Sequence, residues 1–269
     1  MIFPLLGFLF GLLIGSFLNV CIYRWPRDLS VVRPRSHCPV CEKTIAWYDN
    51  VPLLSFLVLG GKCRHCGARI PFRYPVVELL TAVLFFGFVR MFGPSLMALK
   101  MCVFSAILVG LIFADVEERI LPDEFTLGGT VVGLAFSIFV PVPPSIGAFL
   151  LLIAGTGASE RVQWISDAVV GALLPTFFLW LAGWLYLKLR HKEGLGLGDV
   201  KLIAMVGSFL GFGGALFTLL AGSIAGSVIG YGYIRITGKD PGSYELPFGT
   251  FLGAAALLVA LAARQVLGS

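Results

Sequence analysis

Charged residues are scarce in this sequence of 269 residues, because Asp, Glu, Lys and Arg together make up only 13% of it. Soluble proteins carry about 25% charged residues, so the composition excludes an ordinary soluble globular protein. Hydrophobic residues make up 58% of the chain. They gather in runs of about 18–25 residues, long enough to cross the hydrocarbon core of a bilayer. We expect an all-α polytopic membrane protein with about eight transmembrane helices, over residues 2–22, 75–93, 96–114, 125–142, 167–189, 198–212, 214–234 and 247–267.

No Lys or Arg precedes the first apolar run, whereas Arg24 and Arg27 follow it. This pattern lacks the basic start of a cleaved signal peptide, so we expect residues 1–22 to stay as a membrane anchor. With both termini outside, sixteen of the twenty Lys and Arg residues fall on the cytoplasmic side, as the positive-inside rule requires. Orientation therefore accounts for the net charge of +5, and the charge does not indicate a nucleic-acid partner.

The first cytoplasmic loop, residues 23–74, is too short to stabilise itself by a hydrophobic core alone. It contains two CxxC pairs, Cys38 with Cys41 and Cys63 with Cys66. Four thiolates with this spacing indicate a closed, structural zinc site. A pair of disulfides is the alternative, which the reducing cytoplasm disfavours.

The remaining Cys and His residues near these motifs are weaker candidates. His37 and His65 adjoin the thiols and could replace a ligand, but four cysteines already complete a tetrahedral set. Cys21 and Cys102 lie in apolar runs, where free cysteines behave as small buried hydrophobic residues. We therefore restrict the predicted metal ligands to the four cysteines of the two pairs.

Two acidic residues stand at the ends of apolar runs: Asp115 follows residues 96–114, and Asp199 begins residues 198–212. The predicted topology places both on the cytoplasmic side. A carboxylate at the edge of the hydrocarbon costs about 2–4 kcal/mol on insertion scales, so such residues usually serve a function. Two carboxylates brought together by helix packing can share one proton and activate a water. We predict that Asp115 and Asp199 form such a catalytic pair, although an N-cap role explains Asp199 alone equally well.

The surroundings of the two aspartates carry further expectations. Asp123 and Glu124 follow Pro122 and are expected in the first turn of a helix, near the positive end of its dipole. The glycine-rich residues 194–198 suggest irregular backbone that lines a polar cavity. Lys201 is expected to contact a lipid phosphate or to bias the local charge.

The 33 glycines are patterned along the expected helices. Small residues at four-residue spacing let helix backbones approach closely in lipid, which is our interpretation, with a flexible gate as the alternative. The stripes are Gly7, Gly11 and Gly15; Gly222, Gly226 and Gly230; and Gly249 with Gly253. Residues 141–166 form a second soluble stretch, partly interfacial and with an apolar centre, which is expected as an insertion on the outer face.

The combination of motifs resembles the type IV prepilin peptidases. It comprises Asp115 with the downstream LPDEFT, GLGLGDVK around Asp199, the HCPVC and CRHC pairs, GSFLNVCIYR near the start and PFGTFLG near the end. This family is distantly similar to the presenilin-type intramembrane aspartic proteases, which share the Gly-x-Gly-Asp motif. The stretch between the two aspartates is longer here than in the family, because of residues 143–166.

The resemblance implies a bacterial inner-membrane enzyme with Asp115 and Asp199 as the catalytic pair and the four cysteines as zinc ligands. It implies cleavage after Gly of the short basic leader of a prepilin or of a type II secretion pseudopilin. It also implies N-methylation of the new N-terminus with S-adenosylmethionine. The expected domains are an anchor at 1–22, the zinc-binding insertion at 23–74 and a seven-helix protease core at 75–269.

Other functions remain open from the residues. A peptidase without methyl transfer is one alternative, because no soluble methyltransferase core with a Gly-rich cofactor loop is visible. Glu78 could contribute to methyl transfer, but a first-turn acid behind Pro75 is the preferred interpretation. A metal or ion transporter would need acidic residues or His in the middle of a span, and a non-enzymatic scaffold would not need the two aspartates. Neither the individual substrate nor the oligomeric state follows from the sequence, although lipid contacts do.

Overall fold

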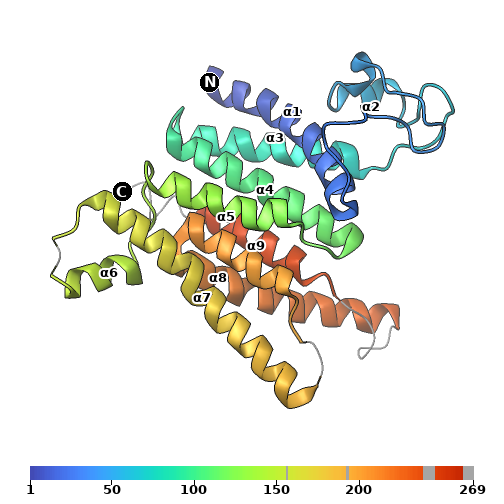
Figure 1. Cartoon of the computed structure of the whole chain (residues 1–269). Coiled ribbons are helices and arrows are strands. Elements are labelled where there is room, and N and C mark those ends of the chain that lie inside the picture. Colours follow the sequence, from blue (N-terminus) through green and yellow to red (C-terminus); the bar gives the residue numbers. More distant parts are fainter. Residues whose placement is uncertain (156, 192–193, 239–245, 263–269) are drawn as a thin grey trace. The chain divides into compact units, whose positions relative to one another are not determined.

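The computed structural model describes residues 1–155, 157–191, 194–238 and 246–262. Regular structure in these residues consists of helices, which confirms the all-α expectation, and β-structure is limited to two isolated bridges. The α-helices are α1 (Ile2–Arg24), α2 (Leu54–Val58), α3 (Arg73–Phe92), α4 (Leu96–Glu118), α5 (Asp123–Ser137), α6 (Ile146–Ile153), α7 (Glu160–Arg190), α8 (Leu197–Thr237) and α9 (Phe248–Ala262) (Figure 1).

The expected number of eight spans is not confirmed. By length and composition, five helices within the described residues can cross a membrane: α1 with its extension to Arg27, α3, α4, α7 and α8. The runs 198–212 and 214–234 form two helical segments, both within the element labelled α8, which are separated at Gly211 by a positive φ of 70°. Helix α5 ends at Ser137 and has 15 residues, so it is shorter than the expected run 125–142.

Helix α9 also has 15 residues within the described range. The end of the expected run 247–267 lies outside the described residues, as do Lys192, Lys239 and Arg264, which contributed to the charge asymmetry. Helix α5 begins at Asp123, with Asp123 and Glu124 in its first turn, as the sequence predicts.

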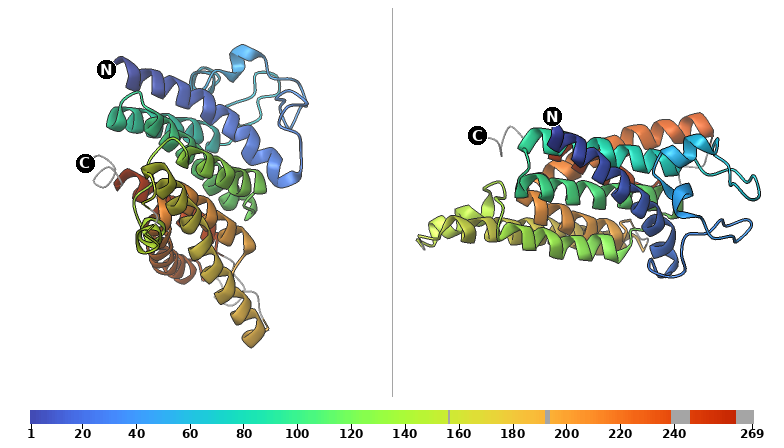
Figure 2. Two further views of the ribbon diagram at one scale, coloured as in Figure 1. Left: turned by 60° about the vertical axis from the view of Figure 1, so that its left-hand side comes forward. Right: turned by 90° about the horizontal axis from the view of Figure 1, so that it is seen from above.

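The chain forms two compact units, Met1–Phe113 and Ala114–Ser269. In the first unit, α1 and α3 pack side by side in opposite directions, which Figure 2 shows from two directions. An added Cβ on Gly11 would lie 2.6 Å from Cα of Ala82, and one on Gly15 would lie 2.7 Å from Cα of Glu78. The glycine stripe of α1 therefore serves close helix packing, as expected.

In the second unit, α8 is the central helix, because α5, α7 and α9 all pack against it. Gly207 of α8 contacts the backbone of Gly171 in α7 so closely that neither position has room for a Cβ. An added Cβ on Gly222 would lie 2.7 Å from Cδ2 of Leu252 in α9. Glycine thus provides the close contacts that bring the start of α9 beside α8.

The insertion at residues 141–166 is attached to α7 by a buried acid. Helix α6 begins next to Ser145, and Oδ1 of Asp167 accepts hydrogen bonds from the Ser145 amide at 2.9 Å, the Ser145 hydroxyl at 2.7 Å and the Ala148 amide at 3.1 Å. Asp167 belongs to α7 and is 1% exposed. Its hydrogen bonds therefore cap the start of α6 from a neighbouring helix.

Candidate active site

Asp115 lies in the last turns of α4, and its side chain is buried, with 5% exposure. Its Oδ2 accepts two hydrogen bonds from Thr250, one from the backbone amide at 2.6 Å and one from the hydroxyl at 2.8 Å. Thr250 is the third residue of α9, where amides lack an acceptor within their own helix. The start of α9 therefore holds the carboxylate of Asp115 in a defined position.

Asp199 lies in the first turn of α8 and is also buried, with 9% exposure. The N-cap of α8 is Gly196, so the alternative that explained Asp199 as a plain N-cap is wrong. The carboxylates of Asp199 and Asp115 are close enough to interact electrostatically. Within the second unit, the fold thus brings together the two acids that the sequence singled out.

Leu121 holds these segments together. It follows α4, and its side chain packs against glycines at the starts of two other helices. A Cβ added to Gly198 would lie 3.2 Å from Cβ of Leu121, and a Cβ added to Gly249 would lie 2.9 Å from Cδ1 of Leu121. Because both glycines lack a Cβ, the starts of α8 and α9 can approach the end of α4, where Asp115 lies.

The glycine-rich segment before Asp199 has the expected irregular backbone at its start. Gly194 and Gly196 precede α8, and an added Cβ on Gly194 would lie 2.5 Å from Cδ1 of Tyr186 in α7. Lys201, for which a lipid phosphate was one expected partner, instead donates to Oδ1 of Asp123 at 2.7 Å. This ion pair links the N-terminal part of α8 to the first turn of α5.

Sequence reasoning missed Thr250. The residue stands in PFGTFLG, where a hydroxyl side chain follows Gly249 at the start of an apolar helix. A Thr in the first turn of a helix is ordinary, so this local signal does not reveal that its donors face a carboxylate 135 residues away. Only the packing of α9 against the end of α4 shows the contact.

The four cysteines of the first unit come together as predicted. The sulfur atoms of Cys38, Cys41, Cys63 and Cys66 all lie within 4.8 Å of one another, and those of Cys38 and Cys66 are 3.8 Å apart. Sulfurs bound to zinc at about 2.3 Å in a tetrahedron are about 3.8 Å apart, so the donor set fits this metal. All four cysteines are free, which disagrees with the disulfide alternative. The histidines do not belong to this cluster of described residues.

The two CxxC pairs form matching knuckles, a repeat that the sequence analysis overlooked. In the first knuckle the Cys38 amide donates to Lys43, the Glu42 amide to Cys38 and the Ile45 amide to Ser36. The second knuckle, residues 61–70, repeats all three bonds at the same spacing from Cys63. The aligned sequences SHCPVCEKTI and GKCRHCGARI carried this signal.

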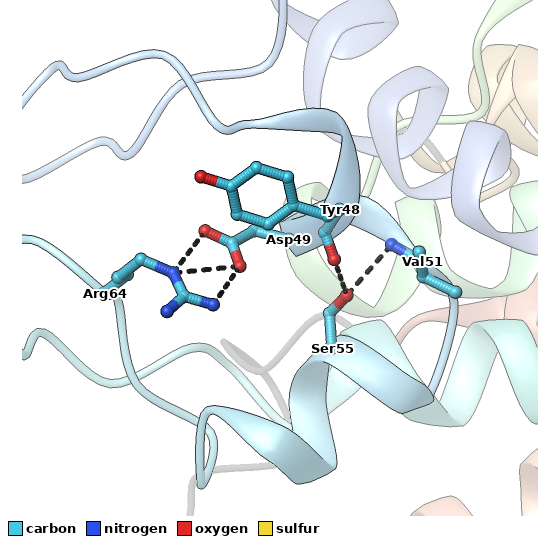
Figure 3. Close-up of polar contacts among 5 residues, drawn as sticks. All are labelled: Tyr48, Asp49, Val51, Ser55 and Arg64. Carbon is cyan, nitrogen blue, oxygen red and sulfur yellow. Dashed lines mark hydrogen bonds and ion pairs between the residues drawn. The ribbon is translucent and has the colours of Figure 1, made fainter.

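Polar contacts attach the second knuckle to the rest of the insertion (Figure 3). Arg64 makes a bidentate ion pair with Asp49, with a shortest distance of 2.6 Å, and these hydrogen bonds hold the pKa of Asp49 below its usual range. Ser55 of α2 accepts from the Val51 amide at 2.9 Å and donates to the Tyr48 carbonyl at 2.9 Å. Residues 48–55 therefore support the loop that carries Cys63 and Cys66.

Glu78 does not have the expected place in a first helical turn. Helix α3 begins at Arg73, and its first turn contains no acidic residue. Glu78 is buried with 7% exposure, and its Oε2 accepts a hydrogen bond from the Leu53 amide at 2.8 Å. Leu53 has a positive φ of 58°, so Glu78 holds a strained turn of the insertion against α3.

Comparison with known proteins identifies the family. Residues 9–92 match the model of the bacterial peptidase A24 N-terminal domain, and residues 102–231 match that of the type IV leader peptidase family. A protein of Myxococcus xanthus named prepilin leader peptidase/N-methyltransferase is 39% identical over 88% of this chain and 65% of its own length.

Proteins of the same name are similar over more of their length. That of Aeromonas hydrophila is 35% identical over 95% of this chain and 89% of its own, and that of Pseudomonas putida is 32% identical over 99% and 93%. No solved structure matches the chain significantly. The chain belongs to the type IV leader peptidase family.

Proposed function

We propose that this protein is a membrane aspartic endopeptidase that removes the short basic leader of type IV prepilins or type II secretion pseudopilins by cutting after Gly. We further propose that it then N-methylates the new N-terminus. Membership of the leader peptidase family and the names of its relatives support both activities. The observation that carries the peptidase proposal is the pair of buried, interacting carboxylates of Asp115 and Asp199.

Hydrolysis by this pair follows the general acid–base scheme of carboxylate dyads. The deprotonated aspartate takes a proton from a water held between the two side chains, and the water oxygen attacks the scissile carbonyl carbon. The protonated aspartate donates its proton to the carbonyl oxygen. The aspartate that took the water proton donates it to the leaving nitrogen as the C–N bond breaks, and the other aspartate takes back a proton from a hydroxyl of the tetrahedral intermediate. The dyad then returns to its state with one shared proton.

The proposed topology explains where cutting occurs. We propose that both termini lie outside a bacterial inner membrane and that the end of α4 with Asp115 and the start of α8 with Asp199 lie at its cytoplasmic face. The basic leader of the substrate stays among the cytoplasmic headgroups, while the apolar segment that follows the cut lies against the membrane helices. The scissile bond is then at the lipid–water boundary. In the proposed topology, the end of α4 and the start of α8 hold the two carboxylates at this boundary.

Methyl transfer needs a donor, for which we propose S-adenosylmethionine. The support is the N-methyltransferase in the names of the relatives, and we assign no residues to the cofactor. A peptidase without methyl transfer is the second candidate. Mass spectrometry of processed substrate separates the two: a mass increase of one methyl group on the new N-terminus supports transfer, and an unmodified N-terminus in the presence of the donor contradicts it.

We propose that Cys38, Cys41, Cys63 and Cys66 hold one structural zinc ion. Four thiolates close the coordination sphere and leave no position for a reacting water, so zinc would stabilise the insertion rather than take part in hydrolysis. The insertion has about 50 residues and little core of its own, which gives the metal a clear structural task.

The decisive experiment is incubation of the purified full-length protein with a prepilin that carries a Gly–Phe junction, followed by mass analysis of both fragments. We expect a single cut after Gly. The matched variants Asp115→Asn and Asp199→Asn keep the size of the side chain and should each abolish cleavage at unchanged expression level. A single variant that still cleaves would refute the pair.

A further inference from the structure

We infer that Thr250 assigns the two roles within the aspartate pair: it keeps the negative charge on Asp115, which acts as the base, and leaves the shared proton on Asp199, which acts as the acid. Thr250 is thus a positioning residue for hydrolysis. This inference rests on the proposed peptidase function, whose scheme does not distinguish the two carboxylates.

The first argument is the number of donors at each carboxylate. Oδ2 of Asp115 accepts from both the amide and the hydroxyl of Thr250, at 2.6 and 2.8 Å. Among the described residues, none donates a hydrogen bond to the carboxylate of Asp199. Hydrogen bonds from N–H and O–H groups favour the charged form of a carboxyl group. Of two carboxylates that share one proton, the one with the donors therefore keeps the charge.

The second argument is the charge around Asp115. Thr250 belongs to the first turn of α9, so its amide is part of the positive end of the dipole of α9. The guanidinium of Arg119, one turn beyond Asp115, also acts on this carboxylate. Asp199 is in the first turn of α8 as well, but the charge that acts on it from outside its helix is the negative charge of Asp115. The dipole of α8 acts on Asp199 in the same sense, so the charge that distinguishes the two carboxylates is that of Arg119, which favours the proton on Asp199.

The third argument is geometric. Both bonds from Thr250 fall on one oxygen of Asp115, and Gly249 places the backbone of α9 directly against the carboxyl group, with an added Cβ 3.2 Å from Cγ. The carboxylate is therefore fixed in rotation before substrate binds. A base that is already oriented toward its water lowers the cost of reaching the transition state.

A set of three variants tests the part played by Thr250. Thr250→Val keeps the β-branched shape and the amide donor but removes the hydroxyl donor, so we expect kcat to fall about 10–100-fold with little change in KM. Thr250→Ser restores the hydroxyl and should recover most of the kcat. Thr130→Val is the matched control, because the Thr130 hydroxyl donates within α5 to the Thr126 carbonyl at 2.8 Å and does not touch a carboxylate.

The outcomes of this experiment are distinct. A Thr250→Val enzyme with the kcat of the wild type would overturn the inference. So would a Thr250→Ser enzyme as impaired as Thr250→Val, because packing rather than the hydroxyl would then be responsible. An equal loss in Thr130→Val would show a general effect of Val in these helices and would also overturn it.

A second experiment tests the assignment of roles. A substrate peptide in which a secondary alcohol replaces the scissile carbonyl places its hydroxyl between the two carboxylates. Asn at position 199 resembles a protonated Asp, so Asp199→Asn should bind this probe within about tenfold of the wild type. Asp115→Asn removes the charged acceptor and should bind at least about tenfold more weakly than Asp199→Asn. The reverse order would overturn the assignment.

Failure of this inference and failure of the proposed function give different results. If the wild-type protein does not cut a prepilin, or if either Asp115→Asn or Asp199→Asn still cuts it, the proposed function itself is wrong. If the wild type cuts, both Asn variants are inactive and Thr250→Val is as active as the wild type, only the role of Thr250 is wrong.

Discussion

An added Cβ on Gly249 would lie 3.2 Å from the carboxyl carbon of Asp115. The same atom would lie 2.9 Å from Cδ1 of Leu121, a contact that forces the leucine or α9 to move. Gly249→Ala should therefore displace the start of α9 from Asp115 and lower kcat about 10–100-fold, since small misplacements of catalytic groups have large effects on rate. Prepilin cleavage by the purified variant measures this effect.

The control for Gly249→Ala is Gly232→Ala in α8, where an added Cβ meets no atom within 4 Å. Ala is favoured over Gly inside a helix by up to about 1 kcal/mol, so this variant should be as stable as the wild type or slightly more stable, and fully active. Equal activity of the two Ala variants would show that close packing at Gly249 is not needed for catalysis.

The ion pair of Lys201 and Asp123 gives a second prediction. The two side chains are 35% and 57% exposed, so the pair should contribute less than about 1 kcal/mol to the free energy of unfolding. Because its ammonium binds Asp123, Lys201→Met should change kcat by no more than about threefold. Thermal unfolding and cleavage assays of Lys201→Met, Asp123→Asn and the double variant measure the coupling. A large loss of kcat in Lys201→Met that Lys201→Arg restores would show that the cation acts on the carboxylates.

The positions of Asp115 and Asp199 could be predicted because a carboxylate at the end of an apolar run is energetically unusual. Their partner Thr250 could not, because its contact depends on how α9 packs against the end of α4. The prediction that Glu78 lies in a first helical turn was wrong for a related reason. Helix α3 starts at Arg73, and the Glu78 carboxylate accepts a hydrogen bond from the strained turn at Leu53 instead of interacting with the start of its own helix. Sequence patterns locate charged residues that are energetically unfavourable in an apolar environment, whereas tertiary packing decides what these residues contact.

The number of membrane spans also shows this difference between what sequence patterns locate and what tertiary packing decides. Apolar runs correctly located the helices, including the two segments that meet at Gly211, but hydropathy did not show that α5 and α9 have only 15 residues each within the described range. Residues 198–212 and 214–234 join at Gly211, whose added Cβ would meet Cγ1 of Val142 at 3.1 Å and the Pro143 carbonyl at 3.3 Å. The break is therefore a packing feature, placed where the segment before α6 crosses α8. The cysteine cluster, in contrast, follows from spacing alone, since two CxxC knuckles leave few other arrangements.

Removal of the proposed zinc ligands gives a third prediction. Cys38→Ala or Cys63→Ala leaves three thiolates, so bound zinc should fall from about one ion per chain to near zero, and the insertion should become sensitive to protease. Elemental analysis of purified protein and limited proteolysis measure both effects. Cys21→Ala and Cys102→Ala are the controls, because these buried cysteines lie outside the cluster and should leave the zinc content unchanged. Full zinc content in Cys63→Ala would exclude the four-thiolate site.

The two knuckles offer a matched backbone comparison. Gly67 has a φ of 70°, and an added Cβ would meet no atom within 4 Å, so the effect of Gly67→Ala is confined to the backbone. This strain should weaken the knuckle by about 1–2 kcal/mol, measurable as faster loss of zinc to a chelator. Glu42 occupies the equivalent position with a φ of 56°, so Glu42→Gly should not weaken the site. Faster zinc loss from Glu42→Gly than from Gly67→Ala would contradict the equivalence of the knuckles.

Asp167 should stabilise the insertion at residues 141–166 without taking part in catalysis. Its Oδ1 accepts three hydrogen bonds at the start of α6, and Asp167→Ala leaves those donors without a partner. We expect a loss of about 2–4 kcal/mol in the stability of the docked α6, seen as faster amide hydrogen exchange in residues 145–153. Ser145→Ala removes only the hydroxyl bond and should have a smaller effect.

In the proposed topology Asp167 lies far from the cytoplasmic face, so Asp167→Ala should keep the cleavage rate of the wild type at a temperature where it is folded. A strong loss of kcat in folded Asp167→Ala would show that α6 contributes to the active site.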